Sequence, residues 1–126
     1  MKTDSTADLT RFLGDFITEE KKAGIEKVLS QRTRFITVVL EDIFQPHNAS
    51  AVIRSCDCFG IQDLHVIENK NEYTLNPNVA QGAGKWVSIR RYNQASKNNT
   101  VQCLNQLRQA GYQLYATSPY NTDLDL

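Results

Sequence analysis

The chain has 126 residues, of which 40% are hydrophobic and 22% charged, and its formal net charge at pH 7 is zero. These values fit one small, soluble globular domain. No stretch approaches the ~20 apolar residues of a membrane span, and the N-terminus lacks the apolar core of a signal peptide, so neither membrane insertion nor export is expected. Three cysteines, an odd number, favour reduced thiols and a cytoplasmic location.

Charge is distributed unevenly along the chain. Between Asn69 and Thr122 there are six basic residues and a single acid, Glu72, so this stretch carries about +5. That charge would give a modest electrostatic footprint on phosphate groups, but an ordinary solvated face has the same composition. Both interpretations stay open from composition alone.

The first part of the chain is predicted to be helical. Apolar residues recur at helical spacing from Leu9 to Ile17, after a capping-box pattern that begins at Ser5. Thr18 is expected to start a second helix, with acids in its first turn and Lys27 in its last. We therefore expect a helical extension over residues 1–34, followed by a separate domain over residues 35–126.

The second part alternates between apolar strands and amphipathic helices. The first strand is expected to be buried on both faces, as in a parallel sheet. The order of strands and helices predicts an α/β fold with a mostly parallel sheet. The four predicted strands are Phe35–Leu40, Leu64–Ile67, Trp86–Arg91 and Gln113–Thr117.

Two helices are expected between these strands, and a long polar loop runs to about Gly84. Asn48 is predicted to cap the first helix and Gly60 to end it. The second helix is predicted over Thr100–Ala110. The expected apolar faces are Ala51, Val52, Cys56 and Phe59 in the first helix, and Val101, Leu104 and Leu107 in the second.

The common cofactor and metal motifs are missing. The loop after the first predicted strand lacks the Gly-x-Gly-x-x-Gly of a dinucleotide site. Gly82-Ala83-Gly84-Lys85 has the wrong spacing for a phosphate loop, and Trp86 stands where Ser or Thr would bind magnesium. No cysteine or histidine spacing fits a zinc site, and a cysteine nucleophile would have only His47 as its base.

Asn48 and Arg54 form the most informative pair. They are six residues apart, nearly two helical turns, so both are expected to border one side of the helix. The start of a helix favours anions such as phosphate, and its dipole does not favour an arginine there. Arg54 is therefore either a functional cation or a surface residue paired with Asp57 or Asp42.

The residues around this pair form a longer pattern. Small and aliphatic residues separate Asn48 from Arg54, and Phe59-Gly60 follows. This pattern resembles the first signature of the SpoU (SPOUT-class) family of RNA ribose methyltransferases. Other segments similar to the family are Val39-Leu40-Glu41-Asp42, Pro46-His47-Asn48, Gln81-Gly82-Ala83-Gly84-Lys85-Trp86-Val87 and Tyr115-Ala116-Thr117-Ser118.

The resemblance covers roughly Thr18 to Pro119, and the predicted helix before Arg32 is similar to the tRNA guanosine branch of the family. It implies methyl transfer from S-adenosylmethionine to a ribose 2′-hydroxyl of a guanosine in tRNA. The alternative function is the same methyl transfer with ribosomal RNA as the substrate. A non-catalytic RNA-binding half-domain is the alternative of another class, if the chain ends naturally at Leu126.

The resemblance also implies roles for individual residues. Arg54 would activate the hydroxyl together with a substrate phosphate, and since a guanidinium is a poor base, its role would be electrostatic. Asn48 would orient Arg54 or the ribose, and Thr117 would touch the cofactor. Phosphates of the RNA would be held by Arg32, Arg34, Lys85 and Arg90.

The implied fold is of the α/β-knot class, and the implied complete enzyme is a homodimer. In the family, later Gly-x-Glu and Ser-Leu-Asn-rich signatures form the knotted loops that hold the cofactor. These signatures do not occur before Leu126, so we expect the C-terminal knot to be missing from this chain.

Overall fold

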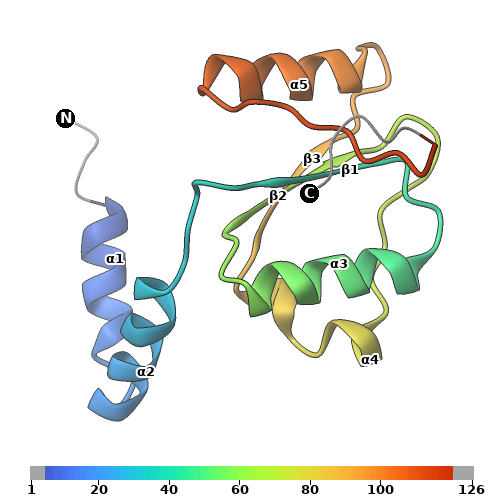
Figure 1. Cartoon of the computed structure of the whole chain (residues 1–126). Coiled ribbons are helices and arrows are strands. Elements are labelled where there is room, and N and C mark those ends of the chain that lie inside the picture. Colours follow the sequence, from blue (N-terminus) through green and yellow to red (C-terminus); the bar gives the residue numbers. More distant parts are fainter. Residues whose placement is uncertain (1–4, 121–126) are drawn as a thin grey trace.

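The computed structural model of the chain describes residues 5–120 and begins with two helices, α1 (Ser5–Gly14) and α2 (Glu19–Ser30), as expected (Figure 1). Thr18 caps α2, because its side-chain oxygen accepts the Lys21 N–H at 3.2 Å. The capping-box side chain at Ser5 lies outside what the structure describes. The two helices stand beside the sheet and join it through an extended segment (Figure 1).

The centre of the molecule is a three-stranded parallel sheet in the order β1 (Val38–Glu41), β2 (Asp63–Ile67) and β3 (Ser88–Tyr92). Helix α3 (Pro46–Cys58) covers one face and helix α5 (Asn99–Gln109) covers the other (Figure 1). This layered arrangement confirms the predicted α/β fold with its parallel sheet.

The core has two parts, one on each face of β2, whose five residues are all buried. Leu64 and Val66 pack toward α3, together with Ile53 of that helix. Ile67 packs on the opposite face, with Cys103 and Leu107 of α5. Successive side chains of a strand point to opposite faces, so the central strand contributes to both parts.

Strand β1 is shorter than predicted, and its expected first residues are outside the sheet. Phe35 is 88% exposed and Ile36 54% exposed. Thr33 pairs with Ile61 and Val38 with Leu64, so five residue steps on one side match three on the other. Two residues must therefore bulge out, and the run that looks like a buried strand is interrupted there.

Helix α3 begins earlier than predicted. Pro46 is its first residue and Gln45 its N-cap, so Asn48 is the third helical residue and the prediction that it caps the helix is wrong. The buried face is also different from the expected one, since Ala51 and Phe59 are exposed. The residues of α3 that are buried are Ala49, Ser50, Ile53 and Cys56.

Ser50 accounts for part of this difference between the expected and the observed buried face of α3. It is fully buried, and its hydroxyl donates to the Pro46 carbonyl at 2.7 Å. A serine satisfied by its own helix can face the core, and its small size lets the helix approach the sheet. Counting only apolar residues in the sequence misses such a position.

The chain after β2 also differs from expectation. The polar loop contains a short helix α4 (Pro77–Ala80) and a 3₁₀ turn η1 (Ala83–Lys85). Helix α5 is present as expected, capped by Asn98, although its buried residues are Asn99, Cys103 and Leu107.

The predicted fourth strand, Gln113–Thr117, is not a strand. The adjacent Tyr112, together with Leu114, packs on the α5 side of the sheet beside Val39, so side chains rather than ladder hydrogen bonds hold the start of this segment. The tail from Ser118 continues past residue 120, outside the described residues. Within residues 5–120 no helix is long and apolar enough to cross a membrane.

Candidate functional site

Helix α3 carries both residues of the signature pair on its solvent side. Asn48 and Arg54 are exposed, whereas Ile53 between them is buried. Six helical residues correspond to about 9 Å along the axis and leave the two side chains about 120° apart around it. The expectation that the two border one side of the helix is therefore wrong. They flank the buried face from different directions.

Arg54 has no hydrogen-bond or ion-pair partner among the residues that the structure describes. The two carboxylates considered as its partners are engaged elsewhere. Asp57 binds Arg32 at 2.7 Å, and Asp42 accepts backbone N–H groups. The interpretation of Arg54 as the partner of Asp57 or Asp42 is therefore wrong, and no other described residue pairs with its charge.

Asp42 organises the loops at the carboxyl ends of β1 and β2. Its backbone is left-handed, with φ 48°. Its Oδ1 accepts the backbone N–H groups of Asn69, Lys70 and Asn71 at 2.7, 2.6 and 3.3 Å. These bonds, the one from Lys70 first, lower the pKa of Asp42. Sequence reasoning missed this role, although an Asp directly after a strand is a common loop-forming signal.

Lys85 lies on the same side of the sheet as α3. Helix α4 and turn η1 both contact α3, and the Ser50 hydroxyl anchors this loop by accepting the Asn76 N–H at 2.7 Å. Ala83 of η1 is buried, whereas Lys85 is exposed. The loop therefore fixes its backbone on α3 and leaves the lysine free for a ligand.

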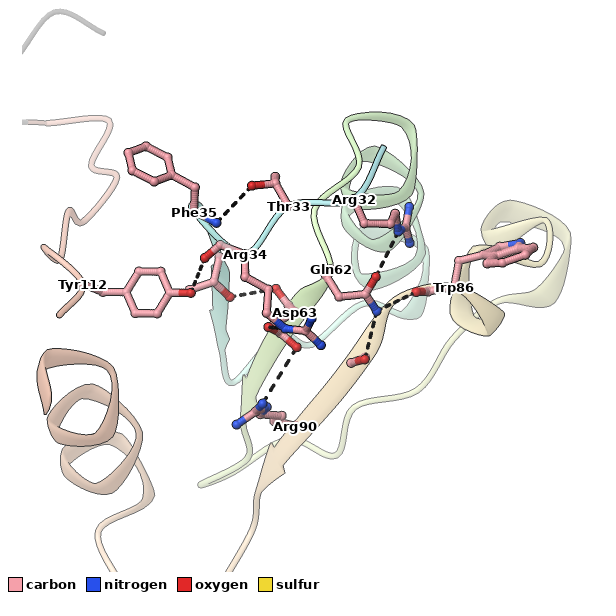
Figure 2. Close-up of polar contacts among 11 residues, drawn as sticks. Arg32, Thr33, Arg34, Phe35, Gln62, Asp63, Trp86, Arg90 and Tyr112 are labelled. Atoms are coloured by element: carbon pink, nitrogen blue, oxygen red, sulfur yellow. Dashed lines mark hydrogen bonds and ion pairs between the residues drawn. The ribbon is translucent and has the colours of Figure 1, made fainter. Parts of the chain in front are cut away.

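Arg34 and Arg90 converge on one buried carboxylate (Figure 2). Nε of Arg34 lies 2.9 Å from Asp63 Oδ2, and Nη2 of Arg90 lies 4.0 Å from Asp63 Oδ1. The two arginine side chains are 64% and 60% exposed. Arg90 pairs in register with His65 on the α5 side of the sheet. The structure thus brings these two arginines together but places them on the face opposite Arg54.

Two predicted site residues remain, Arg32 and Thr117, and neither is an exposed residue of the sheet or of a helix. The Arg32 side chain is only 7% exposed, because its guanidinium binds Asp57 and Gln62 inside the protein. Thr117 is exposed in the irregular segment after α5. Burial of Arg32 could not be foreseen, since its partners lie 25 and 30 residues further along the chain.

The described residues leave a small cleft where the carboxyl ends of two parallel strands meet. The cleft at the carboxyl ends of β2 and β3 has a volume of about 210 Å³ and is lined by residues such as Asn69, Arg91 and Asn93. Small-molecule sites typically enclose roughly 300–1,000 Å³. Thr117 does not line this cleft. No group of three or more potential metal ligands occurs within residues 5–120.

His65 is buried and begins a chain of polar contacts on the α5 face, which ends at the exposed Gln106. Tyr92 O–H donates to Gln106 Oε1 at 3.0 Å, so at its 3.0 Å contact with His65 it accepts from Nδ1–H. Burial lowers the pKa of His65, Arg90 lowers it further, and Asp63 opposes this shift. The imidazole is therefore neutral in the folded protein at pH 7.

Acidification below about pH 6.5 is expected to destabilise the protein partly through His65. The unfolded chain binds a proton at the ordinary pKa, whereas the folded chain binds it only at lower pH, so stability falls as pH decreases through this window. His65→Asn should flatten the pH dependence of the urea midpoint between pH 7 and 5.5. His47→Asn, at an exposed histidine, is the matched control. Equal slopes for wild type and His65→Asn would contradict this assignment.

The fold is thus a parallel sheet with an exposed arginine on the helix between its first two strands, and this arginine has no partner among the described residues. The model of the SpoU rRNA Methylase family matches residues 35–125, and the chain belongs to this family. The resemblance drawn from the Asn48–Arg54 pattern is thereby confirmed.

Several relatives are named as tRNA methyltransferases. The chain is 49% identical over 106 residues to the tRNA (guanosine(18)-2′-O)-methyltransferase of Borreliella burgdorferi, covering 84% of this chain and 46% of the relative. It is 31% identical over 101 residues to the Thermus thermophilus protein of the same name, covering 80% and 50%. The chain thus spans about half the length of the curated relatives it matches.

A solved structure of a protein with a similar name has a similar fold. The Aquifex aeolicus TrmH/SpoU tRNA modifying enzyme superposes with a TM-score of 0.64 at 29% identity, covering 75% of this chain and 46% of that one. The shared part includes an α/β fold like the one described above.

Proposed function

We propose that the complete protein transfers a methyl group from S-adenosylmethionine to the 2′-hydroxyl of a guanosine ribose in tRNA. The observation that carries the proposal is Arg54, which is exposed and has no partner within residues 5–120, at the signature position of a SpoU family member. The tRNA substrate is supported by the names of the relatives. Ribosomal RNA is the second candidate, which the name of the family favours.

Arg54 acts on the nucleophile in this proposal. A ribose hydroxyl is a weak nucleophile and must lose its proton as it attacks the methyl group. The guanidinium stabilises the developing oxyanion, and a phosphate of the substrate takes the proton. Asn48 holds the ribose, since its position about 120° around the helix from Arg54 favours contact with substrate over contact with the arginine.

Exposed basic residues on both faces of the sheet hold the RNA. Lys85 serves the α3 face that carries Arg54, whereas Arg34 and Arg90 serve the α5 face. Contacts to phosphates fix the position of an RNA without reading its sequence. A single RNA that touches all of these residues has to pass around an edge of the sheet.

Transfer of labelled methyl from S-adenosylmethionine to unmodified tRNA and to ribosomal RNA, by the complete protein, tests the proposal. Labelled tRNA with the label on a guanosine ribose is the expected product. Label in ribosomal RNA alone would favour the second candidate. RNA binding without transfer to either would favour a non-catalytic RNA-binding module.

Lys85→Ala is expected to weaken tRNA binding and to reduce the slope of log K against log salt by ~1, because one phosphate contact is lost. The slope is measured by filter binding between low and physiological salt. Lys97→Ala removes another lysine from the same basic stretch and should leave the slope unchanged. An unchanged slope for Lys85→Ala would mean that this lysine touches no phosphate.

The remaining features of the complete protein follow the family. We propose a cytoplasmic homodimer in which residues 1–34 form a helical extension and residues 35–126 belong to the methyltransferase domain. Thr117 contacts the cofactor, whose site requires more residues than those described here. Its exposure in the segment after α5 is compatible with such a contact.

A further inference from the structure

The helical extension is joined to the α/β domain by polar contacts of its last three residues, Arg32–Arg34. Arg32 is the member of this segment whose side chain is nearly fully buried. Its Nη1 donates to Asp57 Oδ1 at 2.7 Å and to the Asp57 carbonyl at 3.1 Å, and its Nε donates to Gln62 Oε1 at 3.1 Å (Figure 2 shows the bond to Gln62). Asp57 belongs to the last turn of α3, where carbonyl groups lack helical partners. Arg32 therefore fastens the extension to the end of that helix.

The residues around Arg32 extend this network across the sheet. The Thr33 N–H donates to the Gly60 carbonyl at 2.7 Å, and the Gln62 N–H donates to the Thr33 carbonyl at 2.9 Å. The Gln62 side-chain amide donates to the Trp86 carbonyl at 2.9 Å (Figure 2). The contacts of Arg32 thus reach from the extension to the segment that leads into β3.

Apolar packing contributes little to this joint. Arg32 lines two open clefts, of about 630 and 530 Å³, between α2 and the α/β domain. Val28 and Leu29 of α2 line these clefts instead of filling them. Hydrogen bonds are directional and apolar contacts are not, so the polar network sets the orientation of the extension.

The network leaves one buried donor of Arg32 without a partner among the described residues. This donor is Nη2, and an unsatisfied buried donor costs roughly 1–3 kcal/mol. A buried ion pair is often no more stabilising than an apolar pair of similar volume, and orientation is the better reason to keep one.

We infer that Arg32 is a positioning residue, which holds the helical extension in a fixed orientation on α3, the helix that carries Arg54, and does not itself bind RNA phosphate. The inference rests on the proposed function only for its activity readout. It assigns the extension a fixed place relative to the reacting ribose.

The orientation of the extension can be measured without any activity. Trp86 is the only tryptophan, and a dye on Glu26→Cys in α2, in a Cys58→Ser background, accepts its emission. Cys56 and Cys103 are buried and remain unlabelled. Arg32→Gln and Asp57→Asn should each change the energy transfer, and the double variant should differ little from the larger single effect. Arg11→Gln, which removes an exposed ion pair of α1, is the control. Unchanged transfer in both single variants would overturn the inference.

Methyl transfer and tRNA binding by the complete protein separate positioning from phosphate binding. Positioning predicts that Arg32→Gln and Asp57→Asn both lower kcat, by about ten- to a hundredfold, with the salt slope of tRNA binding unchanged. Phosphate binding predicts a slope reduced by ~1 in Arg32→Gln, and tighter binding in Asp57→Asn because the arginine is freed. The second pattern would overturn the inference. If wild type transfers no methyl group, the proposed function fails while the energy-transfer result still decides the role of Arg32.

Discussion

Replacing Arg54 with alanine is expected to lower kcat for methyl transfer by about 10²–10³-fold, the usual cost of removing one preorganised group that stabilises an oxyanion. The affinity for tRNA should stay within a few-fold, since the RNA is held by several other cations. Because Arg54 is exposed and has no partner in the described residues, its removal should change stability by no more than about 0.5 kcal/mol. A large loss of rate would therefore report on chemistry and not on folding.

Single-turnover transfer to tRNA, filter binding and urea denaturation together check this expectation. Arg54→Lys keeps the charge but not the planar guanidinium, so an intermediate loss of rate is expected. Arg108→Ala, at an exposed arginine of α5, is the control and should transfer methyl groups normally. Full activity of Arg54→Ala would remove the catalytic assignment.

Gly60→Ala is expected to be the most destabilising of the glycine-to-alanine substitutions. Gly60 has φ 71°, and a Cβ placed on it would lie 2.4 Å from the Gln31 carbonyl oxygen. The left-handed backbone alone costs an alanine about 1–2 kcal/mol, and the overlap adds to that cost. Since the overlapping atom is backbone, relief requires the extension to move away from the α3–β2 turn.

Gly82→Ala is the matched control for this experiment. Gly82 has φ 83°, but a Cβ there would meet nothing within 4 Å. It therefore reports the cost of the backbone conformation alone, and the extra loss in Gly60→Ala measures the contact with Gln31. Equal urea midpoints for the two variants would show that Gly60 does not need to be close to the extension.

The sequence was sufficient for features that depend on local patterns. The cap at Thr18 and the apolar run of β2 could be identified because each depends on residues close together in the chain. The start of β1 could not, since the bulge at Phe35 arises from the register between Thr33 and Ile61. The start of α3 depends on a proline-initiated first turn, where Asn48 looked like an equally good cap.

The residues of the candidate site could be proposed from the sequence, but their positions relative to one another could not. Arg54 is found from a spacing pattern, and its exposure agrees with a functional role. No local pattern reveals that Arg90 lies on the opposite face, because that depends on its register with β2. The burial of Arg32 is also not visible in any local pattern, because its partners Asp57 and Gln62 are distant in sequence and come close only in the folded chain.

The joint at Arg32 has a consequence for the order of folding. Its acceptors come from the end of α3 and from the residue before β2, and Gln62 is itself tied to the segment before β3. Parallel strands require long crossovers, so the sheet is assembled through contacts distant in sequence, which form slowly. The extension is synthesised first but can dock only after this slow step. In refolding, the energy transfer between α2 and Trp86 should therefore reach its native value no earlier than the sheet.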